Sequence, residues 1–248
     1  TCLERLLISR KPEVLVTFVV FLSLLLPSSG VSALEHWRNQ PLPTSNRNPL
    51  VQVHDIPEAT AALTAPKDQF LWSSTFDMAS ISSEDLNSLP PTNAQSNESL
   101  LLDGETYRAA FKLRYGLSEQ SDLSITLPFI AHSGGFADNA ISGWHKTFGL
   151  PDGNRANRAD NTLDYRYQRN GQNLLEINQS TKGLGDIRLD YRFRINSDSN
   201  KAASKKSGSN PIKSLIQVGI KLPTGNQDRL TGSGATTLST SVQLTQTH

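Results

Sequence analysis

Alternation of apolar and polar residues is the strongest pattern in the chain. Residues 186–195 (DIRLDYRFRI) place aliphatic and aromatic side chains at every second position and charged ones between them. Residues 105–116 (ETYRAAFKLRYG) and 122–132 (DLSITLPFIAH) alternate in the same way. Successive side chains of a β-strand point to opposite faces, so each segment predicts a strand with one apolar face.

Three further segments alternate more weakly, at residues 70–79, 214–222 and 236–246. A strand that crosses a bilayer at a tilt needs about 9–11 residues, and all six segments have close to this length. Aromatic residues lie near their ends, as in the interfacial girdles of membrane barrels. The pattern therefore predicts an all-β protein, an antiparallel transmembrane β-barrel. A secreted soluble β-sandwich also alternates and is the alternative.

The connections between these segments differ in length. The turn after Tyr115 has about six residues, whereas the segments 81–104 and 134–184 are much longer, a rhythm typical of barrels with short periplasmic turns and long external loops. Within 134–184 we expect an amphipathic helix at 137–148 and a hairpin through Asn170-Gly171, a dipeptide suited to a tight primed turn. The sequence thus predicts a long, structured external loop.

The N-terminal part has two sections. Arg10 and Lys11 precede an apolar run at 14–26, and Val31-Ser32-Ala33 follows, which is the order of a secretory signal peptide. A membrane-anchoring helix is the alternative, but the run is shorter than the roughly 20 residues that a spanning helix needs. We expect residues 1–33 to be removed. Residues 34–69, rich in Pro and Asn, predict an extended segment with one short helical turn near 58–63.

Composition adds few constraints. Removal of residues 1–33 takes three of 24 basic and two of 23 acidic residues, so 21 of each remain and the charge is balanced. A nucleic-acid partner would need a clustered basic excess, which the sequence lacks. The lone cysteine, Cys2, precedes the apolar run, so the exported chain has no disulfide.

Five blocks of sequence carry a resemblance. They are LLLDGETYRAAFKLRYGLSE, LPFIAHSGGFADNAISGWHKTFGLPDG, DYRYQRNGQNLLEI, GLGDIRLDYRF and IKLPTGNQDRLTGSG. In this order they resemble a Gram-negative family catalogued as a domain of unknown function (number 3187), over about residues 46–248. The resemblance implies a barrel in the bacterial outer membrane and brings no assigned activity. GLGD and LPTG, each beside a strand, also resemble a wider set of outer-membrane channels.

Six strands are fewer than the roughly eight of the smallest closed barrels. Outer-membrane barrels usually finish on a terminal aromatic residue, whereas this sequence finishes on Gln246-Thr247-His248. We therefore expect residues 70–248 to be the N-terminal part of a C-terminally incomplete barrel. Its expected partners are outer-membrane lipid and the barrel-assembly machinery.

The residue types of an enzyme site do not come together in the sequence. His132 and Ser133 are adjacent on a strand, so they point to opposite faces and cannot act as base and nucleophile for each other. The histidines have no zinc spacing. Oxygen donors at 152–160 miss the spacing of a calcium loop. We expect no catalytic residue, metal or cofactor.

Energy decides which face of the strands is inward. Cations in hydrocarbon cost about 2–4 kcal/mol each near the midplane, so the apolar faces should meet lipid and the charged faces a lumen. The residues predicted to face the lumen are Arg108, Lys112, Arg114, Arg188, Asp190, Arg192, Arg194 and Lys221. With Asp77 they give seven cations and two carboxylates. This predicts a channel for small anionic solutes; a structural or surface-binding barrel with a plugged lumen is the alternative.

Overall fold

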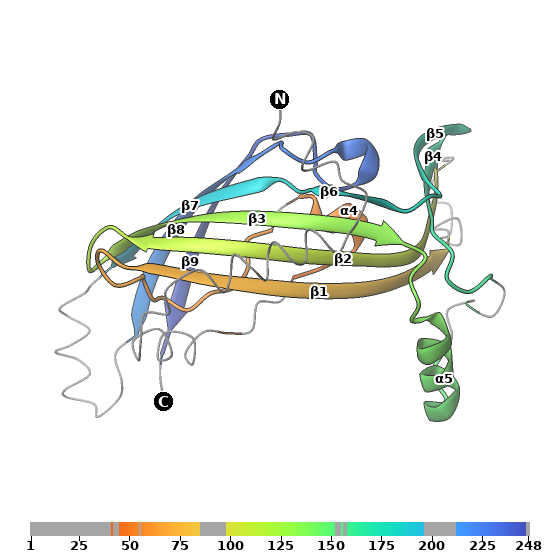
Figure 1. Cartoon of the computed structure of the whole chain (residues 1–248), viewed down its shortest axis with the longest axis horizontal. Helices are drawn as coiled ribbons and strands as arrows, with labels where there is room; N and C mark the ends of the chain where they lie inside the picture. Colours follow the sequence, from red (N-terminus) through yellow and green to blue (C-terminus); the bar gives the residue numbers. More distant parts are fainter. Residues whose placement is uncertain are drawn as a thin grey trace, which may run out of the picture. The chain divides into compact units, whose positions relative to one another are not determined.

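One antiparallel sheet of nine strands makes up most of the chain that the computed structural model describes, which is residues 41, 45–54, 56–84, 98–151, 155, 158–195 and 212–246 (Figure 1). Its strands are β1 (Phe70–Glu84), β2 (Glu98–Gly116), β3 (Ser121–Ser133), β4 (Asp164–Arg169), β5 (Gln172–Ile177), β6 (Thr181–Leu184), β7 (Ile187–Ile195), β8 (Lys213–Leu222) and β9 (Thr237–Thr245). The helices are α4 (Pro49–Gln52), α5 (Asp138–Phe148) and the 3-10 turn η3 (Gln227–Arg229). The predicted signal peptide, residues 1–33, lies outside the described residues.

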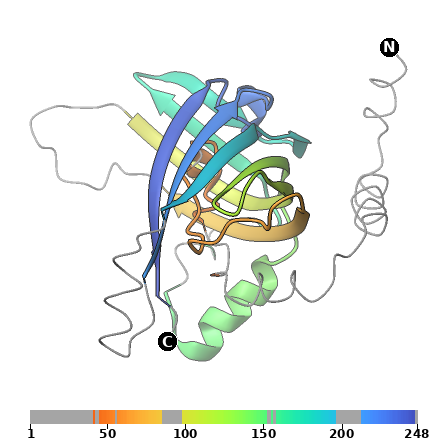
Figure 2. The same cartoon turned by 90° about the vertical axis from the view of Figure 1, so that its left-hand side faces the viewer.

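Six strands form the main body of the sheet in the order β1-β2-β3-β7-β8-β9. β6 continues the line of β7 beside β3, and β4 continues the line of β3 beside the first residues of β2. Figure 2 shows this sheet curled into an open half-barrel, with α4 on its concave side. The all-β class is confirmed, and each of the six predicted segments is a strand.

Two expectations about the connections were wrong. The loop predicted at 81–104 is shorter, because residues 81–84 belong to β1 and residues 98–104 belong to β2. The two strands continue to pair beyond the alternating segments, up to Glu84 opposite Leu101. The helical turn lies at α4 and not at 58–63. Asn48 accepts a hydrogen bond from the Leu50 amide, and Pro49 occupies the first helical position, both of which favour a helix start.

The predicted elements of the long loop are confirmed. α5 begins one residue later than expected and ends at Phe148, followed by the C-cap Gly149, whose φ of 64° is left-handed. β4 and β5 pair through Asn170 and Gly171, with φ of 52° and 75°, as a type I′ turn requires.

The apolar core is small and lies at one end of the sheet, where the β4–β5 hairpin meets the loop that follows β8. It consists of Leu102, Leu163, Tyr165, Ile177 and Leu230. The concave face of the main sheet is not part of this core, and most of its buried side chains are polar or charged.

Candidate functional site

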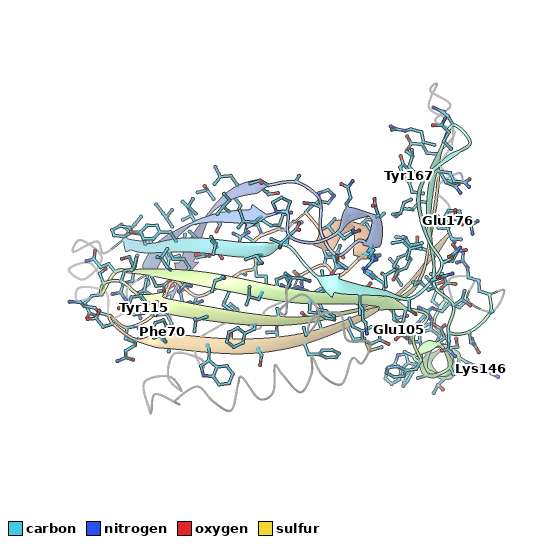
Figure 3. All side chains as sticks on the ribbon, turned by 45° about the horizontal axis from the view of Figure 1, so that its top comes forward. Phe70, Glu105, Tyr115, Lys146, Tyr167 and Glu176 are labelled. Carbon is cyan, nitrogen blue, oxygen red and sulfur yellow. The ribbon has the colours of Figure 1, made fainter. Side chains whose placement is uncertain are left out.

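Cross-strand register arranges the convex face in apolar rows. The row at mid-sheet runs across all six main strands as Trp72, Leu113, Ile125, Leu189, Ile220 and Leu238. The next row toward the β2–β3 turn holds Phe70, Tyr115, Leu123 and Tyr191. Figure 3 shows Phe70 and Tyr115 together at that end of the sheet, where their rings lie 4.6 Å apart. Many of these side chains are exposed, Leu238 at 73%.

The concave face is polar. One residue along each strand from the apolar mid-sheet row is the row Ser73, Lys112, Thr126, Arg188, Lys221 and Thr237. The adjacent row holds Arg114, Ser124 and Asp190, and the next holds Asp122, Arg192 and Gln217. Most of these side chains are buried. In these rows the sheet is inverted relative to a water-soluble fold, with charged residues on the concave face and apolar residues on the convex face, although Leu71, Ile130 and Leu215 are apolar residues buried on the concave side.

A segment N-terminal to β1, described at residues 46–54 and 56–65 and termed the covering segment, lies over part of this concave face. Its backbone makes the contacts: the Ala65 amide donates to Asp122 Oδ2 at 2.7 Å, and the Leu63 carbonyl accepts from Arg192 at 2.9 Å. The Ala62 amide donates to Thr245 of β9 at 2.9 Å. Ala62 is fully buried. The concave side of the half-barrel is thus occupied by the chain itself.

The most buried ion pair of the concave face joins β3 to β7. Arg192 donates from Nε to Asp122 Oδ1 at 2.8 Å and makes a second bond to Oδ2. Arg114 Nε lies 4.0 Å from the same carboxylate. Two guanidinium groups therefore lie beside one aspartate that has no exposure to solvent.

The other predicted lumen-facing residues lie on the same face, and most are paired. Arg108 contacts Asp77, which also binds Arg47 of the covering segment at 2.9 Å. Arg188 binds Asp190 and Ser239, and Arg194 donates to the Glu119 carbonyl at 2.7 Å. Lys112 is half-buried beside Thr126 in its row. The structure thus brings all eight predicted residues to one face of the sheet.

Asp186 organises the end of the sheet opposite the β2–β3 turn. Its carboxylate accepts from Lys221 Nζ at 2.6 Å, from the Gly225 amide at 2.9 Å and from the Ser233 amide at 2.8 Å. Burial alone would raise the pKa of Asp186, but the hydrogen bonds from Lys221 and these two amides outweigh it and hold the pKa below its usual value. GLGD (residues 183–186) and LPTG (residues 222–225) are thus joined by hydrogen bonds, which include one from Thr224 Oγ1 to the Gly185 carbonyl at 2.8 Å.

A second polar cluster lies near the same end. Buried Glu105 accepts from the amides of Phe136 at 3.1 Å and Ala137 at 2.7 Å, and so fixes the start of α5. His132 contacts Thr106 Oγ1 at 2.9 Å and the Leu230 carbonyl at 3.1 Å, and its ring is 1% exposed. Ser133 Oγ instead accepts from the Gly135 amide. A ring with both nitrogens engaged and so little exposure serves packing.

The described residues contain no group of three or more His, Cys, Asp or Glu side chains placed to hold a metal ion. Neither α5 nor the shorter helices of the described chain have the length and apolarity that a membrane-crossing helix requires.

Sequence reasoning missed Asp122 and Asp186, which carry the two most connected ion pairs. Both stand at even-numbered positions immediately before or inside an alternating segment, so parity alone places them with Ser124 and Arg188 on the charged face. With them, the seven predicted cations of the concave face are accompanied by four carboxylates (Asp77, Asp122, Asp186 and Asp190). The count of two carboxylates was wrong.

Comparisons with known proteins add a family and no activity. The sequence model of a family described as "Protein of unknown function (DUF3187)" matches residues 17–248. No curated protein and no solved structure matches the chain.

Proposed function

For a chain that belongs to the DUF3187 family of proteins of unknown function, we propose a role as a bacterial outer-membrane β-barrel protein whose lumen is occupied by its own residues 46–65. Its role in this proposal is structural or surface-binding. Its partners are the acyl chains of the membrane and the barrel-assembly machinery, which would join β1 and β9 to further strands. Residues 1–33 would direct its export.

The observation that carries the proposal is the pair of adjacent rows at mid-sheet. Six apolar residues in register face outward, and six polar residues in register face inward. In water this arrangement leaves apolar area exposed, and each Å² of it costs about 25 cal/mol of free energy relative to burial. In a bilayer the same row meets hydrocarbon. The main strands have 9 to 19 residues, at least the length that a tilted crossing strand needs.

The occupied concave side favours a plugged barrel over an open channel. Residues 46–65 bind Asp122, Arg192 and Thr245, so an ion could not pass these residues without displacing the segment. A channel for small anionic solutes is the second candidate. The excess of cations over carboxylates on the concave face favours it.

Two leucines with equal exposure provide the test. Leu189 lies in the apolar mid-sheet row and is 40% exposed, whereas Leu117 lies in the β2–β3 turn and is 41% exposed. In the full-length protein folded in phosphatidylcholine vesicles, Leu189→Arg should lower the free energy of unfolding by about 2–4 kcal/mol. Leu117→Arg should change it by less than about 0.5 kcal/mol, as a surface substitution does.

Denaturant titration followed by tryptophan fluorescence measures both values. Equal effects of the two substitutions would contradict a lipid-facing convex surface. Folding of the full-length protein in buffer without lipid or detergent, with the Leu189 row protected from solvent, would favour the soluble sandwich instead.

A further inference from the structure

Helix α5 carries an apolar face that the described protein leaves exposed. Ala140 and Ile141 precede Trp144 by four and three residues, and Phe148 follows it by four, so these side chains lie on one side of the helix. Trp144 is 60% exposed and Phe148 59%, and their rings lie 4.3 Å apart. None of the residues of α5 is buried.

The polar face of the same helix is the one that meets protein. Asp138 accepts from Arg155 Nη1 at 2.6 Å and from the Asn161 amide at 2.7 Å. Ser142 and Lys146 border a groove whose other wall is the segment around Arg155 and Asp160. A surface helix of a soluble protein has the opposite orientation, with its apolar stripe toward the core. α5 therefore repeats the inversion of the sheet.

The position of α5 is fixed by the sheet. Glu105 of β2 holds the amides of Phe136 and Ala137, and Arg155 donates to Ser80 of β1 at 3.0 Å. Figures 1 and 2 show α5 beyond the end of the long strands and outside the curl, with its axis across the strand direction. In Figure 3 Glu105 lies at the start of the helix and Lys146 on the helix itself.

We propose that α5 is a membrane-surface anchor whose Ala140–Ile141–Trp144–Phe148 face inserts among the lipids at the headgroup–acyl boundary. The assignment rests on the proposed barrel. Helices that lie in this boundary combine an aromatic apolar face with a charged polar face, as α5 does with Trp144 and Phe148 opposite Lys146. Phe136, 70% exposed, precedes the helix and adds to the exposed apolar area at its start.

A lipid surface fits this face better than a protein partner for a geometric reason. Figure 2 shows α5 outside the curl of the sheet, the side onto which the outward rows project, and the polar face of the helix is turned toward Arg155 and Asp160. One bilayer can therefore contact both the sheet and the helix. The helix stands where the crossing strands end, which is the depth of the headgroups.

Tryptophan quenching by lipids with brominated acyl chains tests the assignment in the full-length protein. One variant keeps Trp144 alone (Trp37→Phe, Trp72→Phe), and a second keeps Trp72 alone (Trp37→Phe, Trp144→Phe). The matched control adds Ser142→Trp to a background without Trp37, Trp72 and Trp144, which places the reporter on the polar face. Phosphatidylcholine vesicles carry bromines either near the headgroup or near the chain end.

Trp144 should emit at shorter wavelength in vesicles and be quenched more by shallow than by deep bromines. The Ser142→Trp reporter should be quenched much less. Quenching of Trp72 without quenching of Trp144 would overturn the anchor and leave the barrel intact, as expected if a second copy or another protein covered the helix. Absence of quenching at both positions would overturn the barrel. Equal quenching of the Trp144 and Ser142→Trp reporters would overturn a one-sided surface helix.

Discussion

Asp122 and Arg192 are opposite each other in register on β3 and β7, and their side chains are 0% and 2% exposed. The same carboxylate accepts the Ala65 amide, so this pair also ties residues 46–65 to the sheet. Removing one partner of a buried ion pair leaves an uncompensated charge. The resulting loss of stability exceeds the net stabilisation that the intact pair provides.

Asp122→Asn should therefore lower the free energy of unfolding by about 3–5 kcal/mol, since it leaves Arg192 and Arg114 without their shared carboxylate. Equilibrium unfolding in urea, in lipid vesicles, measures the loss. Asp228→Asn is the control: Asp228 lies exposed in η3, and its substitution should stay within about 0.5 kcal/mol of wild type. A loss below 1 kcal/mol for Asp122→Asn would mean that water reaches Arg192.

Asp186 predicts a dependence of stability on pH. Its pKa is lowered in the folded protein from an ordinary value of 3.8. A carboxyl group with a lowered folded pKa contributes stability that is fully present above its unfolded pKa and is lost as pH falls through the folded pKa. The stability difference between wild type and Asp186→Asn should therefore be constant near neutral pH and shrink below about pH 3.8.

Unfolding titrations at pH 7, 5 and 3 on both proteins would show this. Asp228→Asn is again the matched comparison, and its difference from wild type should not vary in the same way. A difference for Asp186→Asn that grows toward low pH would mean that burial, and not Lys221 and the two amides, dominates the carboxyl group.

Two glycines should respond in opposite directions to the same substitution. A Cβ at Gly232 would clash with Asp186 Oδ1 and would lie 2.7 Å from the Gly225 Cα. Gly232→Ala should cost about 1–3 kcal/mol, the range for overpacking. Gly143, inside α5, has open space around a Cβ, so Gly143→Ala should stabilise the protein by about 0.4–1 kcal/mol. Urea titration of both variants checks the sign of each change.

Alternation predicted the strands and the two faces of the sheet because both depend on side-chain type. Asp122 and Asp186 also follow from that parity, once the segments are extended by a residue or two. The covering segment could not be found in this way. It binds the sheet through the amides of Ala62 and Ala65 and the carbonyl of Leu63, groups that nearly every residue possesses, so its sequence carries no signature of the contact.

The ends of β1 and β2 show a second limit. Residues 81–84 have no apolar alternation, yet they pair with 101–104 of β2, because a strand that has started can continue wherever a partner satisfies its backbone groups. The exposure of the apolar face of α5 could not be predicted from the sequence either. Amphipathic spacing shows that a helix has two faces but not which of them meets protein.

The covering segment should block the passage of ions along the concave face. Deletion of residues 46–65 should raise the conductance of the full-length protein in planar bilayers, because it removes the chain that lies over Asp122 and Arg192. Cross-linking that segment to the sheet provides the opposite change: Ala62→Cys with Thr245→Cys joins two residues already linked by a hydrogen bond, and the disulfide should suppress any current that the unmodified protein carries. This second variant keeps the test valid if the deletion impairs folding.

Current through the deleted form should favour anions. Deletion removes one cation, Arg47, and two carboxylates, Asp55 and Glu58, and leaves in place the seven predicted cations and the four carboxylates of the concave face. A confined passage lined by an excess of one sign concentrates ions of the opposite sign, and screening over about 10 Å at 0.1 M salt makes the effect larger at lower salt. Reversal potentials across a potassium chloride gradient measure the preference. A preference for cations would show that Arg108, Arg188 and Arg192 remain neutralised by their partners and that selectivity arises from other residues.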